Sequence, residues 1–350
     1  MRIVIATAQV PFIRGGAEIL AEGLLHALRS QGHTAEIVAI PFKWYPPERI
    51  LEQVLACRLL DLSESGGAPI DRVIGLKFPA YLIPHPHKVL WLLHQFRTAY
   101  DLWDHPFGDL DRYPNGPQVR EGIQRIDQNL IPEAKAVFTI SRNVSSRLWH
   151  YCGIDSVPLY HPPAAAELFY GGPIEDYFFY PSRLASLKRQ ALVLQALAAT
   201  RRPVRVRFAG LADEAHYGET LEMLARQLNV EHRVEWLGQV TEEEKRALYA
   251  HALGVIFPPV DEDYGYVTLE AMLAAKPLIT CTDSGAPLEF VQHDVTGLIA
   301  KPSPQDIAMA MDRLWDDRSW AWAMGEAGKK RYDNLNISWV TVAERLIACD

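Results

Sequence analysis

This sequence of 350 residues lacks the features that identify zinc-binding, disulfide-rich, membrane-spanning and secreted proteins. Its four cysteines lie far apart and form no CxxC pair, so neither a zinc site nor a disulfide framework is expected, and a reducing cytoplasm suits the chain. No apolar run is long enough to span a membrane, and Ile3–Ala8 is too short for the apolar part of a secretory signal. The chain also lacks a G-x-G-x-x-G dinucleotide fingerprint and a G-x-x-x-x-G-K-[ST] phosphate loop.

An excess of positive charge is absent as well. The chain carries 35 Lys and Arg against 43 Asp and Glu, a net charge of −8. Residues 1–165 hold 16 of each sign, so residues 166–350 hold the remaining 19 basic and 27 acidic side chains. Nucleic-acid binding needs a basic surface, so this balance excludes nucleic acid as a general partner. It remains compatible with a local basic pocket for a phosphate.

What the sequence does have is a regular alternation of short apolar strands and amphipathic helices, which predicts βαβ units and parallel sheets. In the first half, the predicted strands are Ile3–Thr7, Ala35–Ile40, Arg72–Gly75, Val89–Leu93, Ala136–Ile140 and Val157–Tyr160, with helices near Gly16–Arg29, Glu48–Leu60, Gln118–Leu130 and Arg142–Tyr151. In the second half, the predicted strands are Tyr177–Tyr180, Val204–Ala209, Arg233–Leu237, Gly254–Phe257 and Pro277–Thr280, with helices at Leu187–Ala199, Glu214–Leu228, Thr241–His251 and Val267–Ala275. Residues 303–350 are predicted to be helical throughout.

The pattern breaks once, at His161–Pro173, where prolines and a Gly pair predict a linker. We therefore expect an α/β protein with two Rossmann-like domains, residues 1–165 and 166–330, that face each other across a cleft. A final helical segment, 331–350, is expected to pack back toward the first domain. In open parallel sheets, ligands bind beyond the carboxyl ends of the strands.

The segment Asp261–Ala275, DEDYGYVTLEAMLAA, places Glu262 eight residues before Glu270, with Gly265 between them. The spacing predicts a carboxylate in a glycine-bearing loop and a second one in the first turn of a buried helix. Carboxylates accept hydrogen bonds from sugar hydroxyls, and a helix N-terminus offers N–H groups to an anion. The alternative is a helix whose early Glu only complements the macrodipole.

Two further segments suit an anion. In RGGAE, Gly15 and Gly16 follow the first strand and open the first helix, where backbone N–H groups can approach a phosphate. In YPSRLASLKRQ, Arg183 and Lys188 flank a predicted helix start, which predicts an anion site. The plain alternatives are a tight turn without a ligand and two exposed basic residues.

Together these segments resemble the glycosyltransferase 4 family of retaining enzymes with the GT-B fold. The resemblance covers most of the chain and is strongest over Tyr177–Gly297, where TDSGAPLEFV also resembles a loop of the family. The chain departs from the family pattern at three places, which are Ser182 and Ala286, where glycine is usual, and the connector YHPPAA.

The resemblance implies a role for each segment. Arg183, Lys188, Gly15 and Gly16 would bind the diphosphate of a nucleotide sugar. Glu262 would lie near the donor sugar, and Glu270 would bind the ribose hydroxyls. The loop Gly238–Thr241 would lie against the base. The resemblance also places Gly210, Gly238, Val240, Tyr264 and Gly265 at the nucleotide, and His94 at the donor sugar.

Other residues have a weaker link to function. A lone His after a strand, such as His94, is more often a structural hydrogen-bonding group. Asp261 and Asp263 form a D-x-D, the metal motif of a different glycosyltransferase fold, and no metal is expected. Phe42, Trp44 and Tyr45 stand beside Lys43 and Arg49, a pattern that allows peripheral contact with a membrane or forms a solvated loop.

The sequence therefore predicts a cytoplasmic, metal-independent hexosyltransferase, which could act at the inner face of the membrane. It would move a sugar from a UDP- or GDP-sugar to a glycan, lipid-linked or small-molecule acceptor, with no tightly bound cofactor. Two alternatives remain, a nucleotide-sugar epimerase of the same fold and a non-catalytic module that binds a nucleotide or glycan.

Overall fold

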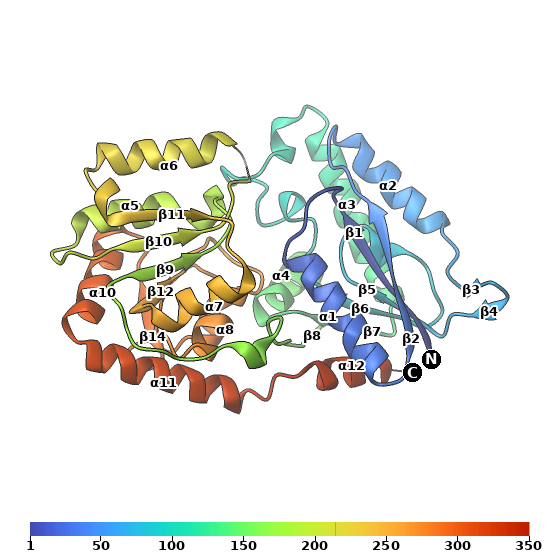
Figure 1. Cartoon of the computed structure of the whole chain (residues 1–350). Coiled ribbons are helices and arrows are strands. Elements are labelled where there is room, and N and C mark those ends of the chain that lie inside the picture. The colour runs from blue at the N-terminus through green and yellow to red at the C-terminus, as the bar shows by residue number, and fades with distance from the viewer. Residues whose placement is uncertain (214, 350) are drawn as a thin grey trace. The chain divides into compact units, whose positions relative to one another are not determined.

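A computed structural model describes residues 1–213 and 215–349 of the chain. Over these residues the chain forms two compact units, one of Met1–Ala164 with Ile337–Asp350 and the other of Ala165–Asn336 (Figure 1). The chain thus passes from the first unit to the second and returns to the first at its end.

The first unit is built on a six-stranded sheet. Its strands are β1 (Arg2–Gln9), β2 (Thr34–Pro41), β5 (Arg72–Gly75), β6 (Lys88–Leu92), β7 (Ala136–Thr139) and β8 (Val157–Pro158). They pair in parallel in the order β2-β1-β5-β6-β7-β8. Its helices are α1 (Gly16–Ser30), α2 (Glu48–Leu59), α3 (Gly116–Leu130), α4 (Arg142–Cys152) and α12 (Trp339–Ile347). A small hairpin, β3 (Glu64–Ser65) with β4 (Ala68–Pro69), projects from it.

The second unit repeats this design with a different strand order. Its strands are β9 (Phe178–Pro181), β10 (Val206–Ala209), β11 (Val234–Gly238), β12 (Gly254–Ile256), β13 (Leu278–Cys281) and β14 (Gly297–Ala300). The order is β11-β10-β9-β12-β13-β14, all parallel. Its helices are α5 (Gln190–Ala199), α6 (Ala215–Gln227), α7 (Glu242–His251), α8 (Tyr266–Leu273), α9 (Pro287–Phe290), α10 (Pro304–Asp316) and α11 (Arg318–Asn334). This order reverses direction between β9 and β12, the place where ligands of such sheets bind.

Short 3₁₀ turns complete the path of the chain. They are η1 (Ala80–Leu82), η2 (Arg97–Ala99), η3 (Leu110–Arg112), η4 (Ile131–Glu133), η5 (Ala166–Leu168), η6 (Ser186–Lys188) and η7 (Glu231–Arg233).

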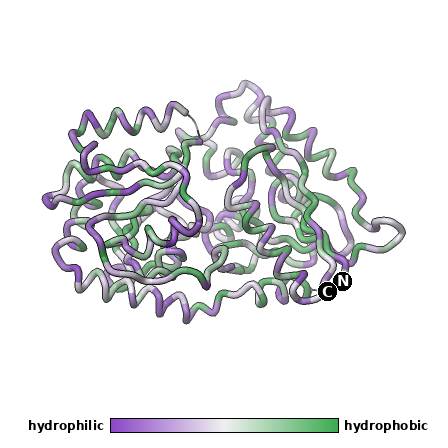
Figure 2. The backbone as a smooth tube through the Cα atoms, viewed as in Figure 1, coloured by the Kyte–Doolittle hydropathy of each residue, from purple (hydrophilic) through white to green (hydrophobic). Residues whose placement is uncertain are grey.

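The apolar residues explain why these elements form. The central strands are buried along their whole length, as the pattern of β6 and β9 shows. Green, hydrophobic stretches of the backbone run through both units in Figure 2. In α1, the predicted stripe of Leu20, Leu24 and Leu28 is buried, which confirms that face. The predicted capping box of α7 is confirmed, because Thr241 and Glu244 each accept a hydrogen bond from the other's backbone N–H.

The predicted elements are confirmed with shifts of a few residues at their ends, and three differences stand out. Residue 214, the first of the predicted helix Glu214–Leu228, lies outside the described residues, and α6 covers most of the rest. The segment 303–349 is not one helical run, because Asp317 and Ser338 each start a new helix by capping it with their side chains. The strand β14 was not predicted from the sequence.

The last helix, α12, is part of the first unit. It lies beside α1 (Figure 1), where the ring of Trp339 fills the space left by the absent side chain of Gly23. The same ring contacts the ring of Trp91 edge to face, with 6.1 Å between their centroids. The carbonyl of Leu346 accepts a hydrogen bond from buried Arg72 at 3.0 Å. These contacts make α12 part of the core of the first unit.

Candidate functional site

Three loops of the second unit meet beyond the carboxyl ends of β9, β12 and β13. Backbone hydrogen bonds connect them: Val260 N–H donates to Leu187 O at 2.8 Å, and Glu262 N–H donates to Ser284 O at 3.0 Å. Ala286 N–H in turn donates to Glu262 O at 2.9 Å. The main chain therefore fixes where the side chains of these loops stand, as a binding site requires.

Lys188 and Glu262 form an ion pair across two of these loops. Their side chains are only 17% and 21% exposed, and the Lys188 ammonium lies 5.5 Å from the centroid of the Phe257 ring. An ammonium group so close to an aromatic ring gains a cation–π attraction. A half-buried cation and carboxylate thus stand side by side at the point where the strand order reverses, one suited to an anion and the other to hydroxyl groups.

The helix after β9 begins later than its sequence predicts. Lys188 lies in the 3₁₀ turn η6, and α5 starts only at Gln190. Between them Arg189 has a left-handed backbone, with φ at 61°, which interrupts the helix. The Tyr180 hydroxyl donates to the Lys188 carbonyl and holds this turn. The predicted helix Leu187–Ala199 therefore begins three residues later, at Gln190.

Arg183 belongs to the same loop and is paired with Asp213, which follows β10. Its Nη1 atom lies 2.7 and 2.9 Å from the two oxygens of that carboxylate. The two side chains are 54% and 39% exposed, so solvent and dissolved ions reach this pair.

Arg189 is a third cation of the loop, and the sequence interpretation did not include it. It forms two hydrogen bonds, of 2.8 and 2.6 Å, with the carboxylate of Asp283 in the loop after β13. These hydrogen bonds raise the pKa of Arg189. The position of Arg189 next to Lys188 was a signal that could have identified it.

Glu270 lies on α8 and is bound to two residues of α7. The Tyr249 hydroxyl donates to Glu270 at 2.6 Å, and Lys245 Nζ donates at 3.1 Å. Burial alone lowers the pKa of Lys245, but the carboxylates of Glu270 and Glu242 raise it above its ordinary value. The prediction that Glu270 lies in the first turn is wrong: α8 begins at Tyr266, directly after Gly265, so Glu270 lies in the second turn.

Two other residues predicted at the nucleotide shape the loop after β12. Gly265 caps α8 with φ at 76°, and an added Cβ would lie 3.0 Å from the Pro287 ring. Tyr264 is 4% exposed, and its ring packs edge to face on Phe290. The Tyr264 side chain is therefore part of the core.

The other predicted nucleotide residues lie beyond β10 and β11. Gly210 has φ at 147°, and an added Cβ would lie 2.2 Å from the Ser182 carbonyl oxygen. Its N–H donates to the Gly238 carbonyl at 2.8 Å. Gly238 itself has φ at 63°, and Val240 lines a pocket of about 320 Å³ beside α7. The two glycines thus bring the loops after β9, β10 and β11 close together.

In the first unit, Gly15 and Gly16 stand at the start of α1, as predicted. The Gly15 N–H donates to the carboxylate of Glu18 at 2.7 Å, so this amide already has an anionic partner. His94 lies after β6, and its Nδ1 donates to the carbonyl of Gln95 at 2.6 Å.

The segment that follows His94 is held by one face of α3. Arg120 and Gln124 both donate to the carbonyl of Ala99, at 3.1 and 3.2 Å. Asp127, which is fully buried, accepts from the hydroxyls of Tyr81 and Tyr100 at 2.8 and 2.7 Å. Burial raises the pKa of Asp127 to about 6.

The aromatic residues proposed for membrane contact differ in exposure: Phe42 is buried and Tyr45 is exposed. Phe42 is 7% exposed and packs against the rings of Phe78 and Phe96, so its expected exposure is wrong. Trp44 donates to Asp109 at 2.9 Å, and Tyr45 remains 49% exposed beneath the ammonium of Lys43. In the described part of the chain, no helix is long and apolar enough to cross a membrane.

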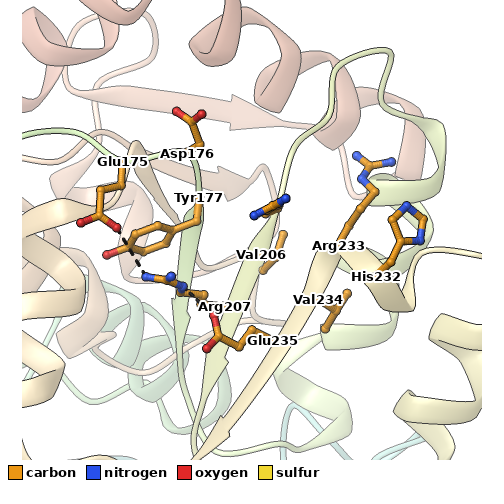
Figure 3. Close-up of a pocket in the computed structure, with 10 residues that line it drawn as sticks. Glu175, Asp176, Tyr177, Val206, Arg207, His232, Arg233, Val234 and Glu235 are labelled. Carbon is orange, nitrogen blue, oxygen red and sulfur yellow. Dashed lines mark hydrogen bonds and ion pairs between the residues drawn. The ribbon is translucent and has the colours of Figure 1, made fainter.

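A second pocket of the second unit, of about 550 Å³, lies at the amino ends of β9, β10 and β11 (Figure 3). Arg207 lines this pocket over the ring of Tyr177, and it is paired with Glu235 at 2.7 Å and Glu175 at 3.7 Å. Its cation is therefore neutralised. The pocket lies at the opposite end of the strands from the loops described above, and we assign it no role in their chemistry.

Comparisons with known proteins bear on the family and the fold of the chain. Residues 173–331 match the family described as Glycosyl transferases group 1. The D-inositol 3-phosphate glycosyltransferase of Corynebacterium aurimucosum is 26% identical over 304 residues, which cover 76% of this chain and 70% of that protein. A GDP-mannose-dependent alpha-(1-6)-phosphatidylinositol monomannoside mannosyltransferase of Mycobacterium tuberculosis is 35% identical over 175 residues, 47% of this chain and 44% of that protein.

The alignments with the first curated relatives span less than half of their length. Among solved structures, Anabaena HepE in complex with UDP-glucose is similar over 99% of both chains, with a TM-score of 0.73 and 16% sequence identity. This likeness confirms the GT-B fold. The family match includes every residue of the site in the second unit, from Arg183 to Glu270. Residues 173–331, which make up most of the second unit, therefore belong to the group 1 glycosyltransferases, the glycosyltransferase 4 family.

Proposed function

We propose that this chain is a retaining glycosyltransferase that moves a hexose from a nucleoside-diphosphate sugar to the hydroxyl of an acceptor. The observation that carries the proposal is the ion pair of Lys188 and Glu262 at the point where the strand order of the second sheet reverses. A diphosphate and a sugar are joined in the donor, and this pair offers a cation and a carboxylate side by side.

The proposed roles follow from the chemistry of each group. Lys188 and Arg183 bind the diphosphate and stabilise the negative charge that grows on it as the bond to the sugar breaks. Glu262 accepts hydrogen bonds from sugar hydroxyls, and Glu270 accepts them from the ribose. The glycines at 210, 238 and 265 allow close approach of the main chain to the nucleotide.

The first unit has its own proposed roles. Gly15 and Gly16 offer amide groups to the diphosphate, and Gly15 then exchanges its Glu18 partner for a phosphate oxygen. His94 is proposed to contact the sugar, and this unit is proposed to receive the acceptor.

The proposed reaction needs no separate catalytic base, because the leaving phosphate accepts the proton of the acceptor. The bond between the anomeric carbon and the phosphate oxygen breaks, and a bond from the same carbon to the acceptor oxygen forms on the same face. The acceptor's proton passes to the departing phosphate. The second unit thus has to stabilise a leaving diphosphate, which preorganised cations do well in a site with little water.

The donor and the acceptor are proposed as classes. A relative acts with GDP-mannose and a solved neighbour holds UDP-glucose, so both GDP- and UDP-sugars are candidates here. The names of the relatives suggest an inositol phosphate or a phosphatidylinositol glycolipid as acceptor. Thermal unfolding with UDP-, GDP- and ADP-sugars would identify the donor, because a ligand of the folded state raises the melting temperature.

Turnover of the identified donor tests the roles. Lys188→Ala and Glu262→Ala should each lower kcat by about 100-fold or more, the effect of losing one preorganised group. Arg202→Ala is the matched control, because this cation is 50% exposed and pairs with Asp316 outside the site. Near-normal rates in both site variants would refute the assignment. Donor conversion without any acceptor would instead indicate an epimerase.

A further inference from the structure

Asp213 is a carboxylate at the predicted diphosphate site that the proposed function does not use. It follows β10, and both its oxygens accept from Arg183 Nη1, at 2.7 and 2.9 Å. Because the pair is neutral as a whole, an arriving diphosphate meets a cation whose charge is already compensated.

The main chain holds Asp213 in this place. Its N–H donates to the carbonyl of Leu184 at 3.1 Å, and Leu184 N–H donates to the carbonyl of Leu211 at 2.9 Å. Leu184 and Ala212 thereby form a parallel bridge that continues the pairing of β9 and β10. The contact between Asp213 and Arg183 therefore joins two loops whose backbones already run side by side.

The three cations of the loop after β9 differ in how readily they can exchange partners. Arg183 is 54% exposed, whereas Lys188 and Arg189 are 17% and 19% exposed. An exposed ion pair contributes about 0–1 kcal/mol, so a diphosphate can displace Asp213 at little cost.

We propose that Asp213 weakens the binding of nucleoside diphosphates by competing with them for Arg183. The inference rests on the proposed function, because it requires Arg183 to bind the diphosphate. The donor and the nucleoside diphosphate product share this group, so the competition acts on both. Product release limits turnover in many enzymes, and a carboxylate that takes back the arginine favours the departure of the product.

Titration calorimetry of the full chain with UDP and with GDP tests the proposal. Asp213→Asn keeps the size of the side chain and removes its charge, so the Kd of the nucleotide that binds should fall by up to about fivefold, or 1 kcal/mol. The matched control is Glu235→Gln, because Glu235 pairs with Arg207 at the same 2.7 Å but at the pocket of Figure 3. The control should leave the Kd unchanged, and the unliganded melting temperatures show that both variants fold.

The double variant Arg183→Ala/Asp213→Asn tests whether Asp213 weakens nucleotide binding through Arg183. If Asp213 acts through Arg183, replacing Asp213 should bring little gain once Arg183 is absent, and a gain there as large as in Asp213→Asn alone overturns the proposal. An unchanged or weaker affinity in Asp213→Asn also overturns it; weaker binding would mean that Asp213 orients Arg183.

The Arg183→Ala variant separates this proposal from the proposed function. Weaker nucleotide binding in Arg183→Ala, without a gain in Asp213→Asn, refutes the role of Asp213 and leaves the function intact. If neither the unmodified chain nor Asp213→Asn binds UDP or GDP, both proposals are refuted.

Discussion

The buried carboxyl group of Asp127 allows a quantitative prediction about stability. This side chain is fully enclosed, and its hydrogen-bond partners are the neutral groups of Tyr81, Tyr100 and, at 3.5 Å, Gln95. Burial raises the pKa of Asp127 from 3.8 to about 6, whereas the unfolded chain keeps the ordinary value. The folded state therefore holds this proton more tightly than the unfolded state does.

The direction in which stability changes with pH follows from the number of protons that the folded and unfolded states bind. Between pH 4 and 6 the folded state binds more protons at this site, so the free energy of unfolding falls as the pH rises through this window. The pKa of Asp127 is raised by about two units, and each unit corresponds to 1.36 kcal/mol. The contribution of this group to the free energy of unfolding is therefore near 3 kcal/mol at low pH, of which about 2 kcal/mol is lost between pH 4.5 and 7.5. The site thus stabilises the fold at low pH and loses this contribution above pH 6.

Asp127→Asn removes the titration and keeps the shape. Urea denaturation of both proteins from pH 4.5 to 7.5 gives the difference in unfolding free energy, in which all other titrations cancel. The unmodified chain should lose about 2 kcal/mol relative to the variant across this range. A difference that stays flat, or that changes in the opposite direction, would refute the reasoning. Tyr81→Phe is the second variant. It removes a hydrogen bond that lowers the pKa of Asp127, so the pH range over which the unfolding free energy falls should extend to higher pH.

Two further predictions concern the second unit. Gly210→Ala should lower the unfolding free energy by at least about 1 kcal/mol, because its φ of 147° and the Ser182 carbonyl leave no room for a methyl group. Gly218→Ala is the control, because the nearest atom to an added Cβ is 3.6 Å away there. In the same urea titration this control should be neutral or stabilising. Glu270→Ala should cost about 2 kcal/mol in that assay, since it leaves the buried Tyr249 hydroxyl without its acceptor and Lys245 with Glu242 alone, whereas Glu270→Gln should cost less. Equal losses in the last two variants would contradict this account.

The sequence predicted the strands and helices well where a buried apolar run or a cap marks them. The strand β5 has the predicted limits, and the capping box of Thr241 and Glu244 starts α7 as expected. These features are local, so a short stretch of sequence contains all the information they need.

The details of the site depend on contacts between distant residues, and there the sequence predicted less. The side chain of Arg189 is bound by Asp283, which lies 94 positions further along the chain. Asp213 meets Arg183 only because β9 and β10 are neighbours in the sheet. Phe42 looked like part of an exposed cluster, but the rings that cover it come from the loops after β5 and β6.

The position of α12 also has a consequence for how this protein is made. Trp339 and Leu346 pack onto the first unit, yet they leave the ribosome only after the whole of the second unit has been made. The second unit is contiguous in sequence and can fold as soon as it emerges, whereas the first unit must wait with its contact surface for α12 uncovered. A fragment that stops at residue 164 would expose the same surface, so shortened versions of this unit should keep residues 337–349 through an engineered connection.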